Sequence, residues 1–158
     1  MVPTGSGSII WDDYNENMEC DLLTVVKTGM ARELREEAGI SAEIEASDLM
    51  RRTMTIGYFR WIDMGGLPEF IGVTDLGSIS SNELVPDEAE VSPLEFPLGT
   101  ISDPIRSTSD VLLYCNVMKQ SGNLSVPLHA IVNRLEEILT RHDAIEAKAT
   151  LMEFLDIK

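Results

Sequence analysis

The most regular pattern in the chain is an apolar stripe at helical spacing that runs into acidic residues. The stripe consists of Leu22 or Leu23, Val26 and Met30. Its intervals of three and four predict a helix from about Leu22 to Ala38, with Asp21 as a suitable N-cap and Gly39 as a suitable end. The next positions on the stripe are Glu33 and Glu37, so this face begins apolar and becomes acidic. An ordinary amphipathic helix carries its charges on the opposite face.

Two stretches rich in threonine, β-branched and aromatic residues predict a β-hairpin after this helix. They are residues 52–63 and 69–76, separated by the turn sequence Gly65-Gly66-Leu67-Pro68. Shorter strand candidates are residues 9–11, 41–48 (with Ile44 and Ala46) and 90–96. The Gly-Ser run within residues 1–8 predicts a flexible start.

The C-terminal third has helical apolar spacing and clear helix boundary signals. Ser107 or Ser109 can cap a helix that ends at Gly122, and Ser125-Val126-Pro127 opens a second helix. The predicted apolar face of this second helix consists of Leu128, Ile131, Val132, Leu135, Ile138 and Leu139. A short last helix is expected to include Leu151, Phe154 and Leu155. The order of strands and helices predicts an α/β protein.

The segment from Arg32 to Ile40 reads RELREEAGI and concentrates carboxylates on one side of the predicted helix. Spacings of three and four place Glu33, Glu36 and Glu37 on one face. Such carboxylates repel one another and lose hydration unless a cation lies among them, and their oxygens suit magnesium, manganese or calcium. The alternative is a solvated helix end with charge pairs such as Arg32 to Glu36.

RELREEAGI resembles the second half of the Nudix box, whose pattern is G-x5-E-x7-R-E-U-x-E-E-x-G-U, with U a bulky apolar residue. Every fixed position from Arg32 to Ile40 is present. The two earlier fixed positions are lost, since Thr24 stands where the box has Glu and Met18 where it has Gly. The matching half is the one that carries the metal-binding carboxylates.

The resemblance implies a single Nudix-like domain over residues 1–158, an α/β/α sandwich with a mixed sheet between helices. Nudix domains carry further strands before the box, and here the box helix begins almost at once. We therefore expect either a chain that lacks N-terminal strands or a shortened sheet. A missing strand leaves an open sheet edge, which favours a homodimer.

The resemblance also implies a metal-dependent pyrophosphohydrolase, in which water attacks a phosphorus of a nucleoside diphosphate linked to another moiety. Glu33, Glu36 and Glu37 would hold Mg²⁺ (or Mn²⁺), and Glu36 and Glu37 would be catalytic. Arg32 would brace these carboxylates through charge-assisted hydrogen bonds rather than touch the substrate. Many family members take a further carboxylate from a downstream loop as a ligand or general base. The candidates here are Glu83, Asp87, Glu88 and Glu90, of which we choose Glu88.

Two other interpretations stay open. A catalytically weak Nudix-like nucleotide-binding or regulatory domain is favoured by Thr24 and Met18, because a threonine hydroxyl supplies neither an anionic ligand nor a base. An acidic helical scaffold with an accidental motif would bind no metal. Tyr58, Phe59 and Trp61 could stack on a nucleobase, but core packing is the favoured role for these aromatic residues.

Composition limits the binding partners and the cellular compartment that we expect for this chain. The 158 residues carry 12 basic and 27 acidic side chains, a net charge of −15, which argues against a basic nucleic-acid-binding surface and against binding to an anionic membrane. Cys20 and Cys115 lack metal-type spacing and are expected to be reduced thiols. With neither a membrane-spanning apolar run nor a signal-peptide pattern, the chain is predicted to be cytoplasmic.

Overall fold

In a computed structural model the chain forms two compact units, Val2–Leu94 and Glu95–Lys158. The structure describes residues 2–3, 9, 13, 21–38, 40, 44–76, 105–122 and 124–157. Each unit is treated by itself below. The fold is mixed α/β, as predicted, while the single Nudix-like domain stays a prediction.

Helix α1 (Leu22–Ala38) has the predicted bounds. Asp21 caps it, because its Oδ1 accepts a hydrogen bond of 2.8 Å from the backbone N–H of Thr24. Val26 and Met30 are buried as expected, and the buried face continues to Leu34, with Glu33 at its border. Placing Leu22 or Leu23 on the stripe was wrong, since both are exposed and the buried face begins at Val25.

The predicted hairpin is confirmed by two antiparallel strands, β2 (Thr53–Trp61) and β3 (Leu67–Thr74). The strands pair from Thr53 opposite Thr74 to Trp61 opposite Leu67, with one irregularity between Thr55 and Gly57. The connection is a short 3-10 helix, η2 (Ile62–Met64), followed by Gly65 and Gly66 at φ of 80° and 77°. The turn therefore starts earlier than predicted, and Leu67 and Pro68 belong to β3.

Two sequence predictions in this unit were wrong at the residues that the structure describes. Within residues 1–8, which were expected to be flexible, Val2–Pro3 forms a short strand, β1, against the end of β3, and the other residues of this segment lie outside the described part. The sheet order is β1-β3-β2, and proline suits β1 because this strand needs few N–H donors at a sheet edge. Of the strand expected at residues 41–48, residues 41–43 lie outside the described part, and residues 46–48 belong to helix α2 (Ala46–Arg51), whose turn buries Leu49 among Ala31, Leu34, Ile40 and Leu76.

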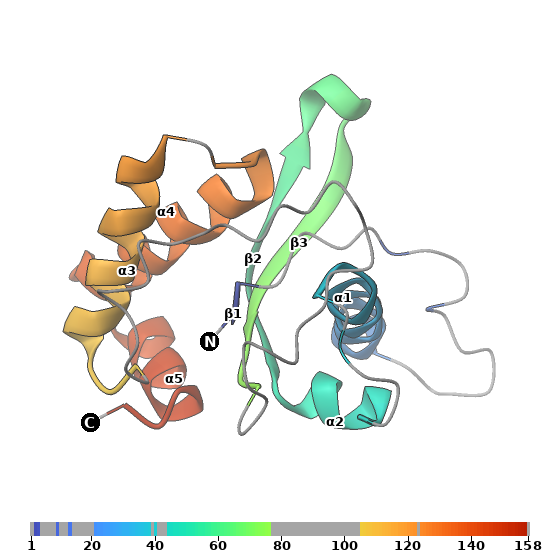
Figure 1. The fold of residues 1–158 in the computed structure, drawn as a ribbon, viewed down its shortest axis with the longest axis horizontal. Helices are drawn as coiled ribbons and strands as arrows, with labels where there is room; N and C mark the ends of the chain where they lie inside the picture. Colours follow the sequence, from blue (N-terminus) through green and yellow to red (C-terminus); the bar gives the residue numbers. More distant parts are fainter. Residues whose placement is uncertain are drawn as a thin grey trace. The chain divides into compact units, whose positions relative to one another are not determined.

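Helix α1 packs on the hairpin (Figure 1), and Gly72 of β3 lies beside Met30 of this helix. A Cβ atom at this position would lie 2.2 Å from Cε of Met30 and 2.6 Å from the carbonyl oxygen of Met54. Real Cβ atoms do not approach other atoms so closely. The methyl group of Met30 ends a flexible side chain and could turn away, but the Met54 carbonyl belongs to the backbone of the paired strand β2, so a larger residue would disturb the pairing of β2 and β3. Glycine thus allows the backbone of β2 to approach β3 closely beside Met30.

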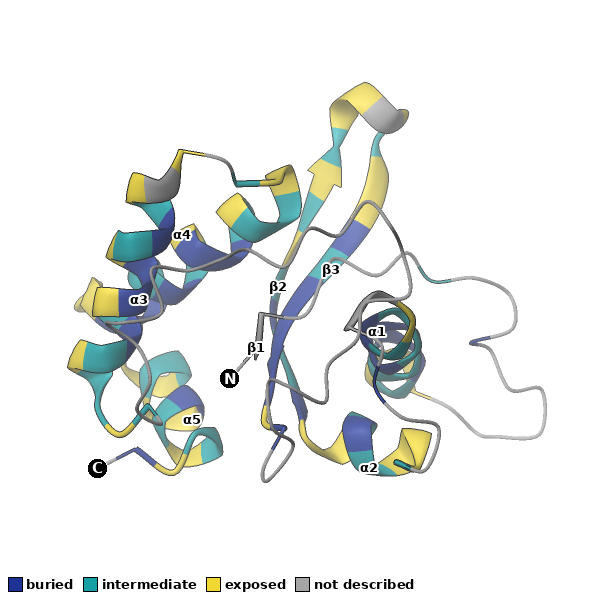
Figure 2. Cartoon of the chain, in the orientation of Figure 1, coloured by how far each residue is buried: buried dark blue, intermediate teal, exposed yellow. Residues whose placement is uncertain are grey.

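The second unit contains α3 (Thr108–Ser121), α4 (Val126–Thr140) and α5 (Ile145–Phe154), close to the predicted bounds. Ser107 caps α3 in a reciprocal arrangement with Asp110, Gly122 ends it in the left-handed conformation, and Ser125 caps α4. Figure 2 shows the buried residues of these helices facing one another within the unit. The predicted apolar face of α4 is buried at Ile131, Val132, Leu135, Ile138 and Leu139.

Several predictions concern residues that the structure does not describe. Of residues 9–11 only Ile9 is described, and it belongs to no strand. The strand expected at 90–96 lies outside the described residues, so the mixed sheet stays a prediction. All strand pairs among the described residues are antiparallel. Among the helices that are described, none is long and apolar enough to cross a membrane.

Candidate functional site

The guanidinium group of Arg32 is the centre of a carboxylate cluster on α1. Its Nε and Nη2 donate to Oδ1 and Oδ2 of Asp13 over 2.9 and 3.2 Å. Its Nη1 lies 2.9 Å from Oε1 of Glu33 and 3.0 Å from Oε2 of Glu36. One arginine therefore engages three carboxylates, and two of them converge on a single nitrogen atom.

The contact with Asp13 is the most buried of the three. The side chain of Asp13 is 2% exposed and that of Arg32 24%, against 19% for Glu33 and 56% for Glu36. The hydrogen bond to Asp13 is also the first cause that raises the pKa of Arg32 above its ordinary value. The guanidinium is charged in any case, and the direction of the shift agrees with its hydrogen bonds to carboxylates.

Gly29, one turn before Arg32 on α1, makes room for Asp13. A Cβ atom at Gly29 would lie 3.0 Å from Oδ2 of Asp13 and 3.5 Å from its Cγ. Because Gly29 has no side chain, the carboxylate of Asp13 can lie against the helix backbone at this position and reach Arg32.

Sequence reasoning missed Asp13. It lies in an acidic stretch with Asp12, Glu16 and Glu19, and no local pattern distinguishes it from those residues. Its role depends on a contact over 19 positions of sequence, which periodicity and spacing do not report.

Of the predicted site residues, Arg32, Glu33 and Glu36 are brought together. Arg32 makes the contacts that bracing the carboxylates would require, and its functional role stays a prediction. The backbone of Glu37 belongs to α1, while its side chain lies outside the described part, as does all of Glu88. The assignments of Glu37 and Glu88 stay predictions.

Thr24 occupies the first turn of α1, eight residues before Arg32. A helix rises 1.5 Å per residue, so these two positions are roughly 12 Å apart along the axis. A carboxylate at position 24 would start two turns away from Arg32. Asp13 instead supplies the carboxylate that approaches Arg32 from outside the helix.

The carboxylate oxygens around Arg32 are the kind of ligand that a hard divalent cation prefers. Three carboxylates share one guanidinium, so three negative charges face one positive charge. A carboxylate has about four acceptor positions, so contact with Arg32 leaves Glu33 and Glu36 able to bind further groups. Among the described side chains, which do not include that of Glu37, no set of three or more His, Cys, Asp or Glu is arranged to hold an ion.

The aromatic residues of β2 divide between two faces. Phe59 and Trp61 lie with ring centres 6.4 Å apart, whereas Tyr58 is 67% exposed and lies 6.2 Å from Phe70. Core packing was the wrong prediction for Tyr58, which is exposed near the hairpin end of β2 opposite Phe70.

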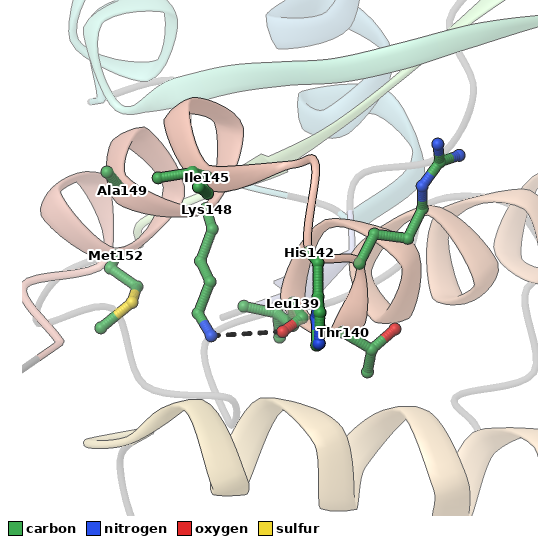
Figure 3. A pocket seen from close by; sticks show the side chains of 8 residues that line it. Leu139, Thr140, His142, Ile145, Lys148, Ala149 and Met152 are labelled. Atoms are coloured by element: carbon green, nitrogen blue, oxygen red, sulfur yellow. Dashed lines mark hydrogen bonds between the residues drawn. The ribbon is translucent and has the colours of Figure 1, made fainter.

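A hollow of about 640 Å³ lies in the second unit at the α4–α5 turn (Figure 3). The lysine and arginine side chains that line the hollow, Lys148 and Arg141, already have partners in the same unit. Lys148 donates to the carbonyl of Leu139 over 3.3 Å, which caps the end of α4, and Arg141 is paired with Glu137 and Asp143. The described site residues Arg32, Glu33 and Glu36 do not line it, so it is distinct from the carboxylate cluster.

Comparison with known proteins found no matching family model, no matching curated protein and no matching solved structure.

Proposed function

We propose that this chain is a metal-dependent pyrophosphohydrolase, which cleaves a nucleoside-diphosphate-linked or related diphosphate substrate by attack of water on phosphorus. The observation that supports the proposal is the convergence of Glu33 and Glu36 on Nη1 of Arg32, with Asp13 behind the same guanidinium. Together with the intact RELREEAGI segment, this convergence gives one helix face an excess of carboxylate charge. Such a face suits Mg²⁺ or Mn²⁺ and, through the ion, an anionic diphosphate.

In this proposal Glu33, Glu36 and Glu37 would hold the metal ion. When bound, the ion neutralises the diphosphate and lowers the pKa of water. Arg32 holds Glu33 and Glu36 in place, which reduces their repulsion and limits their freedom before the ion arrives. Glu88 is the proposed general base or additional ligand.

A second candidate is a Nudix-like nucleotide-binding or regulatory domain with little turnover. The observation in its favour is Thr24, whose position in the first turn of α1 supplies no carboxylate to the site. In this case metal and nucleotide bind, but hydrolysis is slow or absent.

The fold belongs to the same proposal. Helix α1 packed on an antiparallel hairpin, with further helices later in the chain, is compatible with a Nudix-like α/β/α sandwich. A cytoplasmic location and a homodimer stay predictions based on composition and on the expected open sheet edge.

The test is a titration of wild type, Glu36→Gln and Glu37→Gln with Mn²⁺, alongside hydrolysis of a panel of nucleoside diphosphate derivatives. We expect metal binding and turnover in wild type, and a loss of affinity of roughly 10-fold or more in both variants. Glu153→Gln is the matched control, because Glu153 is an exposed glutamate on α5 in the other unit. Binding without turnover would select the second candidate, and absence of metal binding in folded wild type would reject both.

A further inference from the structure

We propose that Asp13 is a positioning residue, which fixes the guanidinium of Arg32 so that its remaining nitrogen holds Glu33 and Glu36 ready for a divalent cation. The inference rests on the proposed function for the identity of the ion. The anchoring itself rests on the contacts of Asp13, Gly29 and Arg32 and can be tested without metal.

The division of labour among the nitrogens of Arg32 supports this role. Nε and Nη2 point to the two oxygens of Asp13, a bidentate contact that defines the plane of the guanidinium. Once the plane of the guanidinium is fixed, the direction of Nη1 is fixed as well, and in that direction Nη1 contacts Glu33 and Glu36. An arginine paired only with the more exposed Glu36 would have no comparable restraint.

Burial explains why an aspartate from outside the helix can do this. Asp13 is almost inaccessible to water, so its contact with Arg32 is screened less than an exposed pair. The bare surface at Gly29 allows the carboxylate to approach α1 closely. The short aspartate side chain and the missing Cβ therefore act together.

The first experiment measures Arg32 itself by NMR without metal. We expect slow rotation of the Arg32 guanidinium and a protected Nε–H in wild type, and faster rotation and exchange in Asp13→Asn. Arg51 is the internal reference, since it is 70% exposed and pairs with the partly exposed Asp48. If Arg32 rotates and exchanges equally in wild type and Asp13→Asn, Asp13 is not the anchor.

The second experiment measures Mn²⁺ affinity in Asp13→Asn, Arg32→Gln and the double variant. We expect Asp13→Asn to weaken binding roughly 10-fold, as outer-shell substitutions do, and to have no added effect when Arg32 is already changed. An equal loss in both backgrounds would show that Asp13 acts on the ion directly or on the fold, and would overturn the inference. Asp48→Asn is the matched control and should bind Mn²⁺ as wild type does.

Gly29→Ala is a further variant that keeps every charge. Alanine favours the helix over glycine, but its Cβ would press on Oδ2 of Asp13. We expect a severalfold loss of Mn²⁺ affinity with α1 intact, and wild-type affinity would count against the anchor. If wild type binds no Mn²⁺, the proposed function fails, while the NMR measurement still decides whether Asp13 holds Arg32.

Discussion

The hydroxyl oxygens of Thr53 and Thr74 lie 2.9 Å apart at the paired ends of β2 and β3, and both residues are 0% exposed. Thr53 also donates to the carbonyl oxygen of Leu49 over 2.7 Å, so its hydroxyl connects the sheet to α2. Because the Thr53 hydroxyl donates its hydrogen to the Leu49 carbonyl, it can only accept the hydrogen bond from the Thr74 hydroxyl. The two threonines form a directed chain of hydrogen bonds.

This direction predicts unequal effects of removing either hydroxyl. Thr53→Val leaves the Thr74 hydroxyl without its acceptor and Leu49 without one donor, and should cost about 1–3 kcal/mol of unfolding free energy. Thr74→Val removes the donor but preserves the bond from Thr53 to Leu49, so it should cost less. Urea unfolding of both variants measures the difference, and a larger loss in Thr74→Val would reverse the assigned direction.

Gly72→Ala should be strongly destabilising, by about 3 kcal/mol, because a methyl group would clash with the backbone carbonyl oxygen of Met54 in the paired strand and would displace the end of the Met30 side chain. Gly65→Ala is the contrasting variant. Gly65 has φ of 80°, and a methyl carbon there would have no described atom within 4 Å, so only backbone strain of about 1–2 kcal/mol is expected. Chemical denaturation compares them, and equal losses would contradict the packing role of Gly72.

The acid stability of α3 should depend on Asp110. The backbone N–H of Arg106, and then Ser107, hold the pKa of Asp110 below its ordinary value. The stabilisation is present above the ordinary pKa of about 3.9 and is lost as the pH falls through the lower folded pKa. As the pH falls from about 5 to below the folded pKa of Asp110, the melting temperature of wild type should therefore fall more than that of Asp110→Asn. Parallel pH dependences in thermal melts of the two proteins would count against this prediction.

Cys115 should react slowly with thiol reagents in the folded protein. Burial first, and Glu136 second, raise the pKa of its thiol to about 11, so little thiolate forms at about pH 8. In a Cys20→Ser background, labelling should be slow in buffer and fast in denaturant, where the pKa returns to about 8.5. Fast labelling of the folded protein would show that the Cys115 thiol is accessible.

The sequence alone determined the features that depend on neighbouring residues. Asp21, Ser107, Ser125 and Gly122 mark helix ends because a cap acts within three or four residues of itself. The residue types of β2 and β3 likewise predicted the hairpin. The convergence of Glu33 and Glu36 follows from helical spacing once α1 forms.

Tertiary structure decided what depends on distant residues. Asp13 reaches Arg32 across 19 positions, β1 pairs with the end of β3, and Leu49 enters a core that turns a predicted strand into α2. The buried face of α1 continues through Leu34 because Leu49 of α2, with Ile40 and Leu76, covers that side, which leaves Glu33 at the border beside Arg32. The local sequence pattern places Glu33 and Glu36 on the helix, whereas only the tertiary structure determines that the buried Asp13 is the aspartate that binds Arg32.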